Sequence, residues 1–158
     1  MGTLKYVSPI GNIFISAANG FITELYFEGG ITTPTTLQEE TPSGSDAQVL
    51  QKLKQELDAY FAGKLKEFTV PLRPVGTPFR TKVWEALQTI PYGETISYKQ
   101  LAERIGNPKA SRAVGGANHN NPISIIIPCH RVVGASGKLV GYGGGLGVKE
   151  FLLELEKK

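Results

Sequence analysis

The stretch SYKQLAERIGNPKASRAVGGANH, residues 97–119, does most to decide the fold of this 158-residue chain. Ser97, with a glutamine three residues later, predicts a helix start closed by a capping box, and Gly106 predicts the end of that helix. Asn107, followed by a proline, predicts a second helix that begins at once and continues towards Asn118. Two short helices joined by a Gly-Asn turn are typical of a helix-turn-helix, but on spacing alone a plain helical hairpin fits as well.

Helical signals also flank this stretch. Upstream, Thr77 followed by Pro78 predicts an N-cap with proline at the first helical position, and Pro91 predicts the end of that helix. Its expected buried positions are Phe79, Val83, Leu87 and Ile90. Downstream, a last amphipathic helix is expected after Gly147. Its apolar positions are Val148, Phe151, Leu152 and Leu155.

The N-terminal third begins with the signals of an antiparallel sheet. Residues 3–28 hold runs of aromatic and β-branched residues. The pair Asn19-Gly20 between two of these runs is typical of a hairpin turn. Residues 29–44 are rich in Gly, Thr, Pro and Ser, and they predict a polar loop.

One helix is expected after this loop. It would start at Ser45 with a capping box to Gln48, and Gly63 would stop it. Its expected buried positions are Leu50, Leu53, Leu57 and Phe61.

Residues 69–76 contain two prolines and are typical of a linker between two domains. We therefore predict an α+β protein. Its small N-terminal α/β domain, residues 1–72, would hold an antiparallel β-hairpin sheet and one helix. Its mostly helical C-terminal domain, residues 73–158, would contain the helix-turn-helix.

The composition, 41% hydrophobic and 20% charged with a net charge of +3, is that of an ordinary globular protein. The charge is unevenly distributed, because no Asp or Glu occurs from Arg104 to Lys149. The cations of that interval are Arg104, Lys109, Arg112, Arg131, Lys138 and Lys149. Either the C-terminal half faces a polyanion, or the gradient arose by chance.

Cys129 is the single cysteine, which excludes an internal disulfide and a Cys-based zinc cage. The first residues show no secretory signal, and no stretch approaches the ~18 apolar residues of a membrane helix. A lone free thiol suits a reducing compartment, so we expect a cytoplasmic protein.

Cys129 also has the neighbours of a nucleophilic thiol. Residues 124–127 predict a short buried strand that Pro128 ends, which would place Cys129 on a turn. His130 and Arg131 follow, and cationic neighbours lower the pKa of a thiol below its usual ~8.5. Side chains of adjacent residues in an extended chain point to opposite faces, so a turn or a water would have to join Cys129 to His130. That geometry disfavours a thiol hydrolase. The simpler alternative is a small core residue, because free cysteine is among the most buried residue types.

The second helix of the motif is thin. Its small residues are Ala110, Ala113, Gly115, Gly116 and Ala117. Arg112 projects from it, and its backbone can approach either an external partner or another helix. The glycine-rich run at 141–147 matches neither the dinucleotide-binding nor the P-loop pattern, and it predicts a loop.

Together, these segments resemble the O6-alkylguanine-DNA alkyltransferases, also called methylated-DNA–protein-cysteine methyltransferases. The motifs that carry the resemblance are IPCHRV (127–132), RAVGGA (112–117), NP (121–122), YGGGL (142–146) and KEFLL (149–153). They occur in order within residues 77–156, whereas the N-terminal third matches only in general style. The resemblance implies repair of O6-alkylguanine, and also of O4-alkylthymine, by irreversible transfer of the alkyl group to the protein in a single turnover.

The resemblance implies a role for each residue near the thiol. Cys129 would be the nucleophile and the permanent alkyl acceptor. His130 would take its proton through a water, with Glu156 orienting the imidazole. Tyr98 would donate a hydrogen bond to the guanine ring so that guanine leaves as a neutral base, and Lys149 would assist. No cofactor and no metal are implied.

The resemblance also implies double-stranded DNA as the partner, bound in the minor groove. The simplest expectation for assembly is a monomer acting alone on DNA. Arg112 would enter the base stack in place of a flipped nucleotide, because an O6 substituent cannot reach a buried thiol while stacked. The residues implied in DNA binding are Tyr98, Asn107, Lys109, Ser111, Arg112, Ala113 and Gly115. Minor-groove contacts carry little base information, so binding should depend on phosphates and damage rather than sequence.

A pocket and a hinge complete the implied site. Their residues are Asn121, Val132, Tyr142, Gly143 and Gly144. Asn121 would tie the second helix to the active-site turn, while the carbonyls of Cys129 and Val132 would contact the exocyclic amine. The backbone near Gly143, which stands where some relatives carry serine, would contact O6. Two other functions stay open: a non-enzymatic damage sensor, although such proteins lack the cysteine, and a helix-turn-helix regulator with a structural thiol.

Overall fold

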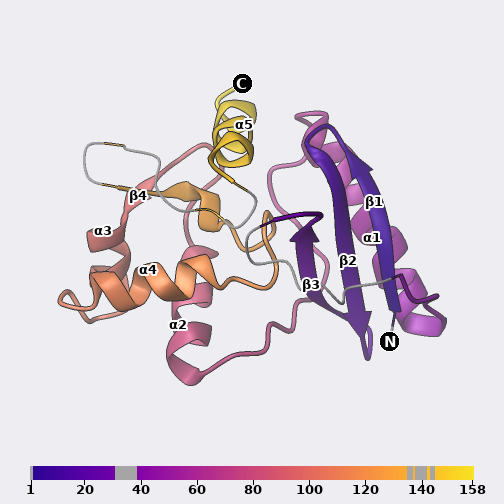
Figure 1. The fold of residues 1–158 in the computed structure, drawn as a ribbon, viewed down its shortest axis with the longest axis horizontal. Coiled ribbons are helices and arrows are strands. Elements are labelled where there is room, and N and C mark those ends of the chain that lie inside the picture. Colours follow the sequence, from indigo (N-terminus) through magenta and orange to yellow (C-terminus); the bar gives the residue numbers. More distant parts are fainter. Residues whose placement is uncertain (1, 31–38, 135–136, 138–141, 143–144) are drawn as a thin grey trace.

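The computed structural model describes residues 2–30, 39–134, 137, 142 and 145–158. An antiparallel sheet with one helix forms the N-terminal part, and the C-terminal part is mostly helical, which is the α+β class predicted (Figure 1). Within these residues, no helix has the length and apolarity needed to cross a membrane. Most of the predicted polar loop, residues 31–38, lies outside the described residues.

The sheet contains β1 (Gly2–Ser8), β2 (Gly11–Ala18) and β3 (Phe21–Phe27) in that order, each antiparallel to its neighbour. The predicted hairpin turn is confirmed, because Asn19 and Gly20 have φ angles of 53° and 80°, which an Asn-Gly pair adopts readily. The apolar face of the sheet enters the core through Tyr6, Ile13, Ile15, Ala17, Ile22, Leu25 and Phe27.

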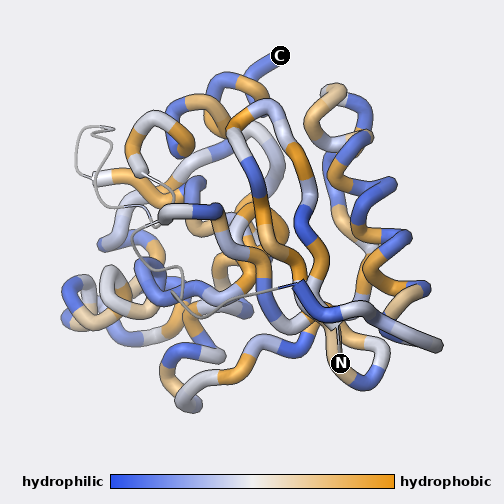
Figure 2. The backbone as a smooth tube through the Cα atoms, turned by 45° about the vertical axis from the view of Figure 1, so that its right-hand side comes forward, coloured by the Kyte–Doolittle hydropathy of each residue, from blue (hydrophilic) through white to orange (hydrophobic). Residues whose placement is uncertain are grey.

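Helix α1 (Gly44–Phe61) packs against this sheet, and hydrophobic and hydrophilic residues alternate along it (Figure 2). The predicted capping box of Ser45 and Gln48 is wrong, because the helix already begins at Gly44 and its N-cap makes no side-chain hydrogen bond. Instead, the Asp46 carboxylate accepts a hydrogen bond of 2.7 Å from the Gly20 amide. The first turn of α1 is thereby tied to the hairpin.

The buried face and the end of α1 agree with expectation except at one position. The predicted residues Leu50, Leu53 and Leu57 are fully buried. Phe61, the fourth predicted residue, is only partly buried, and its neighbour Tyr60 is fully buried instead. Gly63, with a φ of 75°, follows the helix as predicted.

The predicted linker is hydrogen-bonded to the edge of β3. Ile22 donates its amide to Pro71 O and accepts from the Arg73 amide, both at 2.8 Å. Further along the same strand, the Leu25 amide donates to Pro122 O at 2.8 Å. Backbone from both halves of the chain thus satisfies an edge that would otherwise expose unpaired groups.

Helix α2 (Pro78–Leu87) starts as predicted, with the Thr77 side chain accepting a hydrogen bond from the Arg80 amide. It ends at Leu87, short of the predicted Ile90, which is nevertheless buried.

Helix α3 (Tyr98–Arg104) confirms the predicted capping box. The Ser97 hydroxyl accepts from the Gln100 amide at 3.1 Å, and the Gln100 side chain accepts from the Ser97 amide at 2.8 Å. Two of the donors that lack a partner at the helix start are thereby satisfied.

Helix α4 (Ser111–His119) begins later than the predicted Asn107. The Asn107 amide donates to Ala102 O at 3.0 Å, and Gly106 has a φ of 77°, so these residues close the end of α3. Helices α3 and α4 pack on each other and on α2, which is the arrangement that a helix-turn-helix requires.

The strand predicted at 124–127 is wrong. These residues are buried but form turns, with Ile125 at a φ of 71°, and an apolar run alone does not distinguish a strand from other buried structure. After them come a 3-10 turn, η1 (Cys129–Arg131), and β5 (Val132–Val133), which pairs in parallel with β4 (Ile96–Ser97). The predicted last helix is α5 (Leu146–Glu156), although Phe151 is exposed rather than buried.

Candidate active site

Cys129 is the first residue of η1, and only 3% of it is exposed. Before it, Pro128 has a φ of −80° and a ψ of 63°, and the Cys129 amide donates to Ile127 O at 2.7 Å, which is an inverse γ-turn. A turn, rather than an extended chain, therefore connects Cys129 to His130.

Polar side chains surround the buried thiol. Asn121 and Ser124 lie within hydrogen-bonding reach of the Cys129 sulfur, and the Lys149 ammonium acts on it electrostatically. Burial raises the pKa of the Cys129 thiol, and Asn121 and Lys149 oppose that rise without reversing it. Sequence neighbours were expected to lower this pKa, but burial dominates. The resting protein thus holds a protonated thiol that needs a base before it can act as a nucleophile.

His130, the next residue, is the imidazole that the family resemblance names as that base. It is fully buried, and its Nε2 lies 2.7 Å from Oε2 of Glu156. Burial lowers the pKa of His130 even though Glu156 opposes this, so the imidazole is neutral. With Nε2 donating to the carboxylate, Nδ1 carries the lone pair, and this buried atom has no hydrogen-bond partner within the described part of the chain.

The Glu156 carboxylate is held by more residues than sequence reasoning found. Arg131 donates from Nε to Oε1 at 2.8 Å and from Nη2 to Oε2 at 3.0 Å. The Tyr60 hydroxyl donates to Oε2 at 2.6 Å. Burial alone would raise the pKa of Glu156, but the hydrogen bonds from His130 and Arg131 outweigh it and hold this pKa far below its usual range. Arg131 therefore serves the carboxylate rather than the thiol.

Asn121 lies between α4 and the active-site segment. Its Nδ2 donates to Ile127 O at 2.7 Å, and its Oδ1 accepts from the Ile123 amide at 3.0 Å. One turn earlier, Asn118 of α4 donates to the Cys129 carbonyl at 3.4 Å. Sequence reasoning did not single out Asn118 for this contact.

Tyr98 and Lys149 both lie near the sulfur. Burial and the nearby Cys129 raise the pKa of Tyr98, whereas burial lowers the pKa of Lys149 and Cys129 opposes it. The Lys149 ammonium donates to the Val132 carbonyl at 2.6 Å. The Val132 carbonyl was expected to contact the exocyclic amine of guanine. Lys149 already occupies one of its two acceptor positions.

The outer face of the helix-turn-helix is accessible and includes several small residues. The exposed or half-buried residues among those implied in DNA binding are Tyr98, Asn107, Lys109, Ser111, Arg112, Ala113 and Gly115. Ala117 faces inward, where its carbonyl accepts from Trp84 Nε1 at 2.9 Å. A Cβ built on Gly116 would meet nothing within 4 Å. Small residues of α4 thus serve close packing on one side and leave the other side open.

Tyr142 is buried, and its ring lies 5.8 Å from the ring of Phe27 at the end of β3. Gly143 and Gly144, the two glycines predicted to line the pocket, lie outside the described residues.

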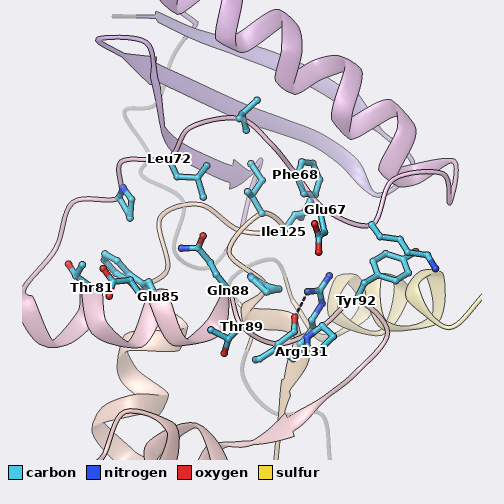
Figure 3. Close-up of a pocket in the computed structure, with 18 of the residues that line it drawn as sticks. Glu67, Phe68, Leu72, Thr81, Glu85, Gln88, Thr89, Tyr92, Ile125 and Arg131 are labelled. Carbon is cyan, nitrogen blue, oxygen red and sulfur yellow. Dashed lines mark hydrogen bonds between the residues drawn. The ribbon is translucent and has the colours of Figure 1, made fainter.

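A cleft of about 840 Å³ runs between residues 66–74, α2 and the far side of the active-site segment (Figure 3). Pro128 and Arg131 line it, but Cys129 does not. The cleft is therefore not the place where a base would meet the sulfur.

Fold and site together define a class: a helix-turn-helix protein whose single buried thiol adjoins a His–Glu pair. Two family models match, the 6-O-methylguanine DNA methyltransferase ribonuclease-like domain at residues 3–74 and the DNA binding domain of the same protein at residues 78–158. The chain belongs to the 6-O-methylguanine DNA methyltransferase family.

Relatives and solved structures agree with this assignment. A methylated-DNA–protein-cysteine methyltransferase of Methanosarcina acetivorans is 49% identical over 96% of this chain and 95% of its own length. One from Mycobacterium leprae is 50% identical over 95% of this chain and 88% of its own. The crystal structure of Mycobacterium tuberculosis OGT in complex with DNA superposes with a TM-score of 0.87 at 49% identity, covering 97% of this chain and 91% of that one.

Proposed function

We propose that this protein repairs O6-alkylguanine in duplex DNA by moving the alkyl group irreversibly onto Cys129, once per molecule. The observation that carries the proposal is a buried thiol, joined by one turn to a His–Glu pair and adjoining a helix whose outer face is small and open. A non-enzymatic sensor or regulator is disfavoured, because such a protein needs neither the Cys129 thiol nor the buried His130–Glu156 pair beside it.

The chemistry starts with the removal of a proton from the thiol. His130 accepts the Cys129 proton at Nδ1 through a water, and the Glu156 carboxylate stabilises the imidazolium that results. The sulfur then attacks the alkyl carbon, so that an S–C bond forms while the C–O6 bond breaks and its electron pair goes to the guanine.

The leaving guanine needs a proton. Tyr98 is the proposed donor through its hydroxyl, and the proton that His130 took from the thiol returns to Tyr98 through solvent, so that both residues end the reaction neutral. Lys149, near both the sulfur and the Val132 carbonyl, supports this transfer. Guanine then departs as a neutral base.

Burial of the sulfur means that the damaged base must leave the helix to react. Arg112 is exposed on α4 and would fill the gap in the stack, and flipping costs a few kcal/mol, less for a weakened base pair. The open side at Gly116 suits a minor groove only ~6 Å wide. Asn107, Lys109, Ser111, Ala113 and Gly115 would contact the flanking backbone, while Asn121, Val132, Tyr142, Gly143 and Gly144 would enclose the base.

We also propose that the protein acts as a monomer in the cytoplasm, that O4-alkylthymine is a second substrate, and that the domains divide at residues 72 and 73. A lone thiol favours a reducing compartment.

Stoichiometry tests the proposed function. Titrating the protein with duplex DNA that carries O6-methylguanine should consume one lesion per molecule and then stop. Cys129→Ala should bind the same DNA and consume none. Continued turnover, or loss of lesions with Cys129→Ala, would contradict the proposal.

A further inference from the structure

Tyr60 contributes a hydrogen bond to the candidate active site from the N-terminal part of the chain. It is the penultimate residue of α1, is fully buried, and donates to Oε2 of Glu156 at 2.6 Å. The two residues lie 96 positions apart in the sequence. Its ring packs against Phe61, Phe68 and Tyr92, so the hydroxyl has little freedom to turn away.

Glu156 needs a restraint of this kind. It is the last residue of α5, where a helix has fewest internal hydrogen bonds to hold it. Its other side-chain donors, His130 and Arg131, are neighbours on η1. Tyr60 is the one donor to this carboxylate from any other segment that the structure describes. It therefore fixes the carboxylate independently of the turn that bears the thiol.

The Tyr60 hydroxyl also stabilises the negative charge on Oε2 of Glu156, the oxygen that contacts the His130 imidazole. Oε2 lies within 3.0 Å of three donors, from Tyr60, His130 and Arg131. Burial and the Glu156 charge raise the pKa of Tyr60 well above its ordinary value, so the hydroxyl remains a donor throughout the pH range in which proteins stay folded.

We propose that Tyr60 is a positioning residue for the proton relay, acting through Glu156 to set the orientation and the proton affinity of His130. This inference rests on the proposed function, because it assigns His130 the role of base. The N-terminal sheet domain thereby takes part in the chemistry of a site built on the C-terminal half.

Tyr60→Phe is the direct test, because it removes the hydroxyl and keeps the ring. Without the hydrogen bond from Tyr60, the negative charge on Oε2 of Glu156 is less stabilised and attracts the imidazolium more strongly. The pKa of His130 should therefore rise. Besides Tyr60, the charged and titratable groups that face His130 are Glu156, Lys149, Arg131 and Cys129, with Tyr92 beside Arg131 and Tyr142 near Glu156. None of these is changed by the substitution.

Tyr6→Phe is a matched control. Tyr6 is a tyrosine that also donates to a carboxylate, that of Asp58 on α1 at 2.5 Å, but this hydrogen bond is only partly buried and does not involve Glu156 or His130. Tyr6→Phe should lose less stability than Tyr60→Phe, because its carboxylate partner is exposed, and it controls for removal of a tyrosine hydroxyl from the same part of the chain. Only Tyr60→Phe should raise the His130 titration midpoint observed by NMR. Because the carboxylate that orients the imidazole is then held less firmly, alkyl transfer at pH 7 should also slow by about tenfold to a hundredfold, the size of one hydrogen bond to a charged group.

A double-mutant cycle separates positioning from general packing. In a His130→Asn background, adding Tyr60→Phe should cause no further loss of transfer rate, because the residue through which Tyr60 acts has gone. Additive losses would overturn the proposal, as would an unchanged His130 midpoint in Tyr60→Phe.

Two measurements do not depend on the activity of the variants: the exchange of the Tyr60 hydroxyl proton and the titration midpoint of His130. If Tyr60→Phe folds poorly, the wild-type protein should still show a slowly exchanging, strongly deshielded hydroxyl proton for Tyr60, and a rapidly exchanging one would contradict the inference. The His130 midpoint needs no alkyl transfer. An inactive wild type would therefore sink the proposed function alone, while the midpoint still decides the role of Tyr60.

Discussion

The helix-turn-helix and the Glu156 cluster differ in how they are built. Helices α3 and α4 lie within residues 98–119 and are set by nearby caps, turns and small residues. The cluster of Tyr60, His130, Arg131 and Glu156 joins three distant segments through buried, charged hydrogen bonds. The first region is local, open and suited to a large partner, whereas the second is non-local, closed and suited to moving a proton. Mutations in the Glu156 cluster should therefore lower mainly the free energy of unfolding, whereas mutations on the outer face of α4 should lower mainly the affinity for DNA or the transfer from it.

Arg131→Ala should have the largest effect on stability. It would leave the Glu156 carboxylate buried without its bidentate partner, and breaking a buried ion pair costs about 3–5 kcal/mol. Urea denaturation of the purified variant measures this loss. A loss below about 1 kcal/mol, the usual worth of a surface pair, would show that the cluster is not closed to water.

Acidification should act next, through His130. Burial lowers its pKa in the folded protein, so the unfolded chain binds more protons below the ordinary value of 6.5. Stability should therefore fall as the pH drops from about 6.5, by about 1.4 kcal/mol for each unit by which the pKa is lowered. Glu156 should add its own loss only below about pH 4.5, because its folded pKa is depressed.

Unfolding free energies of wild type and His130→Asn at several pH values check this prediction. The variant should lack the decline between pH 6.5 and 5. Parallel curves for the two proteins would contradict the neutral, buried imidazole.

Gly116→Ala should separate folding from DNA contact. The new methyl group meets nothing in the protein, and alanine replaces glycine inside a helix, so stability should rise by roughly 1 kcal/mol. The same methyl group would stand in the groove, so affinity for duplex DNA should fall. Denaturation and fluorescence anisotropy together measure both effects, and unchanged DNA affinity would remove α4 from the groove.

Arg112→Ala should have the smallest effect on stability, within about 0.5 kcal/mol, because the residue is exposed. Transfer from duplex DNA should nevertheless fall at least tenfold, since nothing then fills the stack. Reaction with a free O6-alkylguanine base, which needs no flipping, should stay at the wild-type rate. An equal loss on both substrates would argue against the proposed role.

The two regions also mark what could be predicted from the sequence. The capping box at Ser97, the hairpin at Asn19-Gly20 and the stop at Gly63 depend on neighbouring residues, and all three are confirmed. The later start of α4 was missed because the Asn107 amide is already used to finish α3. The Ser45 cap failed because α1 already begins at Gly44 with Ser43 as its N-cap, so Ser45 lies inside the first turn.

The site was predictable only in part. Cys129 and His130 were singled out from their local sequence and Glu156 through the family resemblance, and the structure brings His130 and Glu156 within 2.7 Å. The contact of Tyr60 with Glu156 could not be predicted, because helical spacing indicates burial but not which hydroxyl reaches a carboxylate 96 residues away. The raised pKa of Cys129 was missed because burial, which outweighs the cations, is not visible in a motif.

The central claim is that the sulfur at position 129 receives the alkyl group. Equimolar protein and duplex DNA containing O6-methylguanine should be incubated, digested and analysed by peptide mass spectrometry. We expect one added methyl mass, confined to the peptide that contains Cys129, with an equal amount of unmodified guanine restored in the DNA. An unmodified Cys129 peptide after the lesion has disappeared, or a lesion that persists beside folded protein, would contradict the account.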